Sequence, residues 1–250
     1  MPQIFRAIRR KLLQRQRIAN YSLYALGEIV LVVVGILIAL QINNWNDRRQ
    51  LTAKEHGYLR NLRADLVSNI DKMETFLSER RAIMEAAQYV VNALEAPTVG
   101  DPEAFNRNCI RVYEWQRFVQ VDFTLQELLY SGSLGLIRQE EIKAGLLRLQ
   151  SATETNQAEE DHLRFDAEQL FYMPLYTQYD LHPMLRAYAG EKGVLTPEYF
   201  DGFHDDPRFK NGFLMAILEF TKLNGQMEQM VIMCQDLIAA IDEEVGGGES

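Results

Sequence analysis

The 250-residue sequence predicts an all-α fold, in which one N-terminal transmembrane helix is followed by an antiparallel helical bundle with coiled-coil-like seams. Three observations predict this class. One run near the N-terminus is apolar enough to span a membrane, later segments repeat apolar residues every three or four positions, and no β-rich segment of comparable length occurs. We expect a basic segment at 1–20, a transmembrane helix at 21–45, a helical body at 46–245 and a flexible tail at 246–250.

The transmembrane prediction rests on residues 29–40, all of which are apolar or glycine. The pattern extends to 21–42 if one charge, Glu28, is accepted. At about 1.5 Å per residue this stretch reaches roughly 33 Å, against a hydrocarbon core of about 30 Å. A buried core helix and a cleaved signal peptide are the alternatives, but no small-residue cleavage site follows Ala39. We therefore expect an uncleaved membrane anchor.

Charge is distributed unevenly along the chain and sets the expected orientation. Residues 1–27 carry six basic and no acidic side chains, whereas residues 51–250 carry 18 basic and 33 acidic ones. The positive-inside rule then puts the N-terminus in the cytoplasm and the body in the periplasm of a bacterial inner membrane. The acidic body argues against nucleic-acid binding, because phosphate contacts need clustered Lys and Arg.

The basic segment has a second interpretation. Phe5, Ile8 and Leu12 recur at helical spacing among the basic residues, a pattern that favours a helix lying on anionic membrane lipid. A plain charge cluster that only sets topology is the alternative. The expected lipid contacts are Arg6, Arg9, Arg10, Lys11, Arg15 and Arg17.

Two segments carry a resemblance to a known family. GEIVLVVVGILIALQINNWN at residues 27–46 and ELLYSGSLGLI at residues 127–137 are similar to a bacterial family of single-span membrane proteins, which is known only as a domain of unknown function and is common in Bacteroidota. The resemblance implies the single-span topology. It implies no reaction, cofactor or catalytic residue.

The apolar segment also carries a stripe of mostly small residues at helical spacing, comprising Ala25, Glu28, Val32, Gly35 and Ala39. Small residues four apart let membrane helices approach closely, so we expect a homo-oligomer or a subunit of a membrane protein complex. A carboxylate inside a membrane span is costly and marks function by default, whereas a span shifted outward leaves Glu28 at the lipid headgroups. Both interpretations of Glu28 stay open.

Apolar periodicity in the body predicts long helices at about 53–95, 138–171 and 207–245. No Gly or Pro interrupts residues 36–56, so the first of these helices can continue directly from the transmembrane helix. The pair Asp206-Pro207 matches the N-cap and first position of the last helix.

Two of these helices carry heptad seams. The seam of the 138–171 helix is polar in its middle, at Thr153, Asn156 and Glu160. In the 207–245 helix, steps of four and three continue throughout, a repeat that predicts knobs-into-holes packing. Asn224 at a seam position would fix register at some cost in stability. The expected seam includes Phe213, Ile217, Phe220, Asn224, Met227 and Val231.

The sequence offers no catalytic constellation, since it has no Gly-rich phosphate loop, nucleophile elbow or Cys–His pairing. Glu159 and His162 form one Glu-x-x-His pair, half of the di-iron bundle motif, but no other histidine follows a Glu by three residues. We expect a solvated acidic face there, with no metal and no cofactor. A disulfide between Cys109 and Cys234 is allowed in an oxidising compartment, although Cys234 falls in the apolar seam.

These observations predict a protein that is no enzyme and that acts through protein–protein contacts, as a scaffold, assembly or sensing subunit held at the membrane. The alternative is a homo-oligomeric channel or ion-conducting assembly with Glu28 near its axis. No motif identifies the partner or the number of subunits.

Overall fold

In the computed structural model, which describes residues 3–114 and 116–247, every regular element is helical, and this confirms the predicted all-α class. Side-chain burial is described for Leu26 and for residues 28–114 and 116–247. The chain divides into two compact units, Met1–His56 and Gly57–Ser250.

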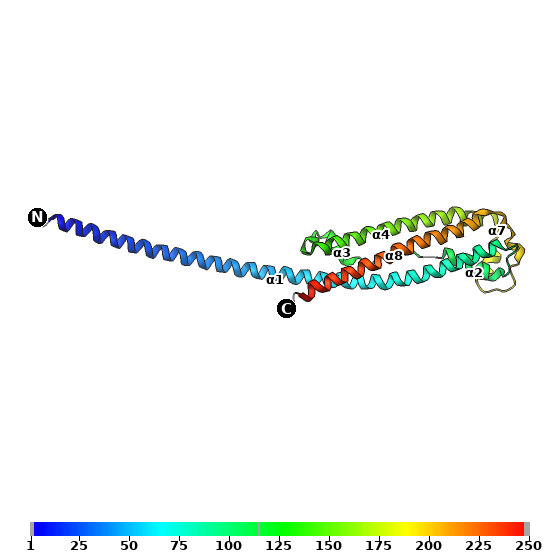
Figure 1. Ribbon diagram of the computed structural model, residues 1–250, viewed down its shortest axis with the longest axis horizontal. Helices are drawn as coiled ribbons and strands as arrows, with labels where there is room; N and C mark the ends of the chain where they lie inside the picture. The colour runs from blue at the N-terminus through cyan, green and yellow to red at the C-terminus, as the bar shows by residue number, and fades with distance from the viewer. Residues whose placement is uncertain (1–2, 115, 248–250) are drawn as a thin grey trace. The chain divides into compact units, whose positions relative to one another are not determined.

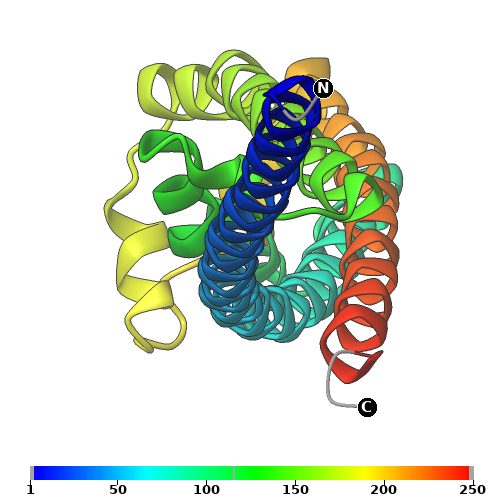
Figure 2. The ribbon, with the colours of Figure 1, turned by 90° about the vertical axis from the view of Figure 1, so that its left-hand side faces the viewer.

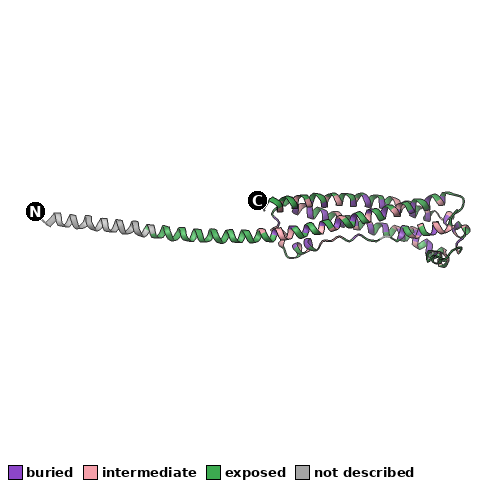
Figure 3. Ribbon diagram, turned by 90° about the horizontal axis from the view of Figure 1, so that it is seen from below, coloured by how far each residue is buried: buried purple, intermediate pink, exposed green. Residues whose placement is uncertain are grey.

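The first unit is formed by the N-terminal part of helix α1 (Gln3–Glu95). This helix passes without a break through the expected boundary between the transmembrane segment and the body, because no helix-breaking Gly or Pro lies there. Residues 28–51 are all exposed (Figure 3). Alternating buried and exposed residues begin only after this stretch.

The second unit contains the remainder of α1 and ten further helical segments. The chain order is α2 (Pro102–Tyr113), α3 (Phe123–Tyr130), η1 (Ser133–Leu136), α4 (Glu140–Ala167), η2 (Glu168–Tyr172), α5 (Met173–Gln178), α6 (His182–Tyr188), η3 (Pro197–Phe200), α7 (Asp201–Asp205) and α8 (Pro207–Gly247). The segment η2 is one π-helical turn that joins α4 to α5.

Within this unit, α8 runs antiparallel to α1 (Figure 1). Arg63 of α1 pairs with Asp242 near the end of α8, and Glu95 at the end of α1 pairs with Lys210 at the beginning of α8. The ion pairs at both ends of the contact show the antiparallel direction of the two helices.

Helix α8 is also antiparallel to α4, so α1 and α4 run in the same direction (Figure 1). Gln139, just before α4, donates to Glu244 of α8, and Lys222 of α8 pairs with Glu159 of α4. The chain returns between the two parallel helices through an extended linker that includes residues 116–122. This linker takes the path that a fourth helix would take in a simple up-and-down bundle.

The buried core has two parts. The part around the beginning of α4 is mainly aliphatic and includes Leu59, Leu146 and Ile241. The part beneath the short helices is rich in phenylalanine and includes Phe105 and Phe203. Figure 2 shows α8 (orange to red) on one side of the second unit and the short segments after η2 (yellow) on the other. Each fully buried Leu or Phe contributes about 1.5–3 kcal/mol, so these clusters hold the three long helices together.

Helix α8 buries a face that is wider than one heptad seam. Of the expected seam residues, Phe213, Phe220, Asn224 and Met227 are buried, whereas Ile217 and Val231 are half-buried at the edge of the face. A helix packed against two neighbours presents a broader apolar stripe than a two-stranded coiled coil. The buried face also includes a row that the expected seam left out, formed by Ala216, Leu223, Met230 and Leu237.

The last helix begins where the sequence predicts and ends two residues later than predicted. Helix α8 begins at Pro207, and the Asp206 carboxylate accepts a hydrogen bond from the backbone N–H of Arg208 at 3.0 Å. The helix continues to Gly247, so the expected tail begins too early at 246. Residues 248–250 of that tail lie outside the described residues.

Candidate functional site

The exposed part of α1 is the first candidate. Among the described residues, one helix is long and apolar enough to cross a membrane, and its apolar window is not buried against any other part of the chain. Ile, Leu and Val side chains of residues 29–42 are all exposed. A core helix of a water-soluble protein would bury this surface, because exposing so large an apolar area to water is unfavourable.

The small-residue stripe lies on this exposed segment. Glu28, Val32, Gly35 and Ala39 are exposed, and apart from the neighbouring residues and nearby backbone of α1 itself, no described atom lies within 4 Å of the position that a Cβ on Gly35 would occupy. The side chain of Ala25 lies outside the described residues. The described part of the stripe therefore has no packing partner among the residues whose side chains the structure describes.

The expected lipid contacts cannot be placed in the same way. Their backbone belongs to α1, but their side chains lie outside the described residues, and this holds for Arg6, Arg9, Arg10, Lys11, Arg15 and Arg17.

The second candidate is a buried ion pair in the centre of the second unit. Arg80 of α1 and Glu160 of α4 form a salt bridge, and their side chains are only 2% and 1% exposed. The Glu160 carboxylate also accepts from the backbone N–H of Phe118, with 3.3 Å to each oxygen. Burial raises the pKa of Glu160 and lowers the pKa of Arg80, while their mutual attraction opposes both shifts.

The extended linker explains two of the three polar residues in the middle of the α4 seam, Thr153 and Glu160. Backbone groups of an extended segment must find partners when they are buried. Asn69 of α1 makes two hydrogen bonds to the backbone of Val121, of 2.8 and 2.7 Å, and Thr153 of α4 donates to the side chain of Gln120 at 2.6 Å. The polar residues thus bind the linker and position it between α1 and α4, which is a structural role.

Two buried amides are less well paired. Asn156 donates to the side chain of Gln226 at 3.0 Å, and Asn224 contacts the sulfur of Met84 at 3.6 Å. The amide oxygens of both asparagines are buried without a hydrogen-bond partner. A buried unsatisfied acceptor costs about 1–3 kcal/mol, so Asn224 lowers the stability of the seam.

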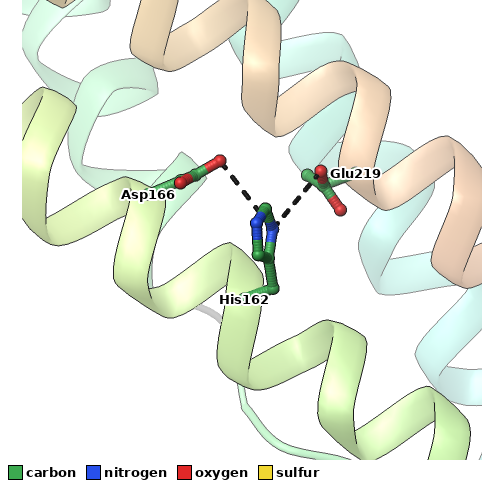
Figure 4. A group of neighbouring side chains, drawn as sticks. All are labelled: His162, Asp166 and Glu219. Atoms are coloured by element: carbon green, nitrogen blue, oxygen red, sulfur yellow. Dashed lines mark ion pairs between the residues drawn. The ribbon is translucent and has the colours of Figure 1, made fainter.

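The third candidate is a cluster of one histidine and two carboxylates between α4 and α8 (Figure 4). His162 Nδ1 lies 3.9 Å from Asp166 Oδ2 and 3.7 Å from Glu219 Oε1. The three side chains are 58%, 21% and 9% exposed, in the order His162, Asp166, Glu219. We call these residues the His162 cluster.

The His162 cluster differs from the pair expected from the sequence. Glu159 forms a 2.6 Å salt bridge with Lys222 on the surface and is not part of the cluster. His162 instead faces Asp166, one helical turn onward, and Glu219 from α8. The Glu-x-x-His spacing identified the histidine but not the two carboxylates beside it.

The two cysteines do not form a disulfide. Both are free and buried, Cys109 in the phenylalanine-rich part of the core and Cys234 in the aliphatic part. Burial raises the pKa of the Cys234 thiol to about 12 and also raises that of Cys109. Both thiols therefore stay protonated and behave as small apolar side chains.

Comparison with known proteins bears on α1. Residues 28–95 match a family described as "Family of unknown function (DUF6090)". No curated protein and no solved structure matched the chain.

The DUF6090 match begins at Glu28 and ends at Glu95, the last residue of α1. It includes most of the segment at 27–46 that resembles an uncharacterised family, whereas the segment at 127–137 lies outside it. The match provides no reaction, ligand or partner.

Proposed function

We propose that this protein is a single-pass bacterial inner-membrane protein that acts through protein–protein contacts, as a scaffold, assembly or sensing subunit. In this proposal residues 21–45 span the membrane, the N-terminus is cytoplasmic and the helical body is periplasmic. One observation carries the proposal: residues 28–51 form an exposed helix, mostly apolar up to residue 42, joined to a separately packed unit. The charge asymmetry on the two sides of the segment supports the orientation.

Exposed aromatic residues on the second unit support a role in protein contacts. Phe123 and Tyr130 lie at the two ends of α3, two turns apart on the same side, and are 78% and 88% exposed. Single exposed apolar residues are common, but aromatic side chains are enriched where proteins bind one another. We therefore expect the exposed side of α3 to contact a partner.

A photoreactive amino acid in place of Tyr130 tests this role in cells. We expect a crosslinked product of defined mass that contains a membrane or periplasmic protein, or a second copy of this chain. The matched control is the same amino acid in place of Tyr188, a half-exposed tyrosine on α6. Equal crosslinking at both positions, or none at Tyr130, would contradict a specific contact through α3.

The second candidate function is a homo-oligomeric channel with Glu28 near its axis. It is favoured by the unpartnered stripe, on which Glu28 shares one face with Val32, Gly35 and Ala39. If several spans pack through this face, their carboxylates converge and can select cations. Glu28→Gln should then change conductance in reconstituted bilayers, and Gly35→Leu should prevent assembly. Wild-type oligomer without any current would remove this candidate.

A further inference from the structure

We propose that the His162 cluster binds one divalent transition-metal ion, with His162 and Asp166 supplied by α4 and Glu219 supplied by α8. Imidazole nitrogen and carboxylate oxygen are ligands that Zn²⁺, Mn²⁺, Fe²⁺ and Co²⁺ accept. The ion would join the two helices at a point where Figure 4 shows all three side chains turned toward one another.

The distances in the cluster are close to those that such an ion needs. Two ligand atoms that are each 2.0–2.2 Å from a tetrahedral ion are roughly 3.3–3.6 Å apart. The distances from His162 Nδ1 to the two carboxylate oxygens, 3.9 and 3.7 Å, are a few tenths of an ångström longer. All three ligand atoms lie within 4.8 Å of one another, so the two carboxylates need to approach each other by roughly 1 Å at most.

Glu219 provides an independent reason to expect a cation. Its side chain is nine-tenths buried, and its Oε2 is the one carboxylate oxygen of the described residues that is buried without a hydrogen bond. A buried carboxylate oxygen without a hydrogen bond is costly. The nearby cation Lys222 forms its salt bridge with Glu159 and acts on Glu219 through its charge, without a hydrogen bond to this oxygen. The other oxygen, Oε1, faces His162, and a metal ion bound to the carboxylate there would lower the cost of burying it.

The exposure of the cluster suits an ion that enters from solvent. Glu219 is the buried ligand, Asp166 is intermediate, and His162 is more than half exposed. With three protein ligands, the remaining coordination positions would be filled by water. Because the ligands come from α4 and α8, binding would stabilise the folded bundle relative to the unfolded chain.

The test measures metal binding by full-length protein in detergent, prepared without a histidine tag. Stripped protein is dialysed against Zn²⁺ or Co²⁺, the bound metal is counted by mass spectrometry, and the visible spectrum of bound Co²⁺ reports nitrogen and oxygen ligands. We expect one ion per chain and a higher midpoint of thermal unfolding with metal. His162→Ala and Glu219→Gln should each weaken binding at least about tenfold, since even outer-shell changes cost 10–100-fold.

Two control variants distinguish the His162 cluster from binding at the sequence motif or at another exposed histidine. Glu159→Gln removes the carboxylate of the sequence motif, and His182→Ala removes an exposed histidine elsewhere. Both should bind metal as the wild type does. Glu219→Gln should remain about as stable as the metal-free wild type, because it replaces a mostly buried carboxylate that has one oxygen without a hydrogen bond, and this keeps its loss of binding interpretable.

Several results would overturn the proposal. If wild-type protein binds no stoichiometric ion, the His162 cluster is not a metal site. If His162→Ala binds metal as tightly as the wild type, the ion lies elsewhere. If Glu159→Gln abolishes binding, the site is the sequence motif and not the cluster.

Discussion

Replacing Arg80 with Met tests whether the buried ion pair holds the bundle together. Met has a similar length, so most of the packing of the Arg stem is kept, but Glu160 loses its charged partner. Breaking a buried pair by removing one member costs about 3–5 kcal/mol. Arg117 offers little compensation, because its guanidinium is half exposed and lies 3.8 Å from the Glu160 carboxylate.

The loss should depend on pH in a defined direction. Burial already raises the pKa of Glu160 above its ordinary 4.5, and removing the attraction of Arg80 raises it further. A carboxyl with a raised folded-state pKa is stabilised by folding in its protonated form, so stability falls as pH rises above 4.5 toward the folded pKa. One group changes the free energy of unfolding by at most about 1.4 kcal/mol per pH unit. The Arg80→Met penalty should therefore shrink by up to about 2.7 kcal/mol between pH 7 and pH 5.

Urea unfolding followed by helical circular dichroism measures both effects. With a denaturant slope of about 3 kcal/mol/M, the Arg80→Met midpoint should fall by about 1–1.7 M at pH 7. The double variant with Glu160→Gln is the control, because it removes the second buried charge and keeps an acceptor for the N–H of Phe118. It should recover most of the stability and lose the added pH dependence. Equal stability of Arg80→Met and the wild type at pH 7, or no recovery in the double variant, would refute the reasoning.

Three further predictions concern helix α8 and its contacts, each measured by thermal unfolding. Asn224→Leu should raise the midpoint by about 2–4 °C, since it removes an unsatisfied acceptor worth about 1 kcal/mol; a lower midpoint would show that a bound partner satisfies that oxygen. Gly145→Ala should lower stability by about 1 kcal/mol, because the new Cβ would lie 2.6 Å from a methyl group of Leu237. The cost of this overpacking exceeds the gain in helix propensity from Gly to Ala. Adding Leu237→Val should restore part of the lost stability. Asp206→Ala should lower the midpoint at pH 7. Hydrogen bonds from Arg208 lower the Asp206 pKa from 3.8 to about 2, so its contribution is present above 3.8, and the difference from wild type should vanish as pH falls through about 2.

The helices could be predicted from the sequence because their signals are local. Pro207 after Asp206 marks the beginning of α8, and apolar residues at steps of three and four give its length. The sequence could not show which apolar residues of α8 are most deeply buried, because apolar residues line more than one side of the helix. The packing of α8 against both α1 and α4 decides this, and it buries Ala216 and Leu223, which lie outside the expected seam.

The extended linker and the His162 cluster could not be predicted, because both depend on residues far apart in the sequence. Residues 116–122 have no periodicity, and their backbone partners are Asn69 of α1 and Glu160 of α4. The polar seam on α4 signalled that something polar lies opposite, but not that it is a strand-like backbone. Similarly, Glu219 reaches His162 only because α8 folds back along α4.

Residues 21–45 are proposed to anchor the protein in the inner membrane with the helical body outside the cytoplasm, and one measurement tests both parts of this proposal. Alkaline phosphatase is fused after Val245, and the membranes of the cells are then washed with alkaline carbonate. We expect an active fusion that stays in the membrane pellet. An inactive fusion beside an active cytoplasmic reporter at the same site would reverse the orientation, and release of the fusion into the soluble fraction would contradict the anchor.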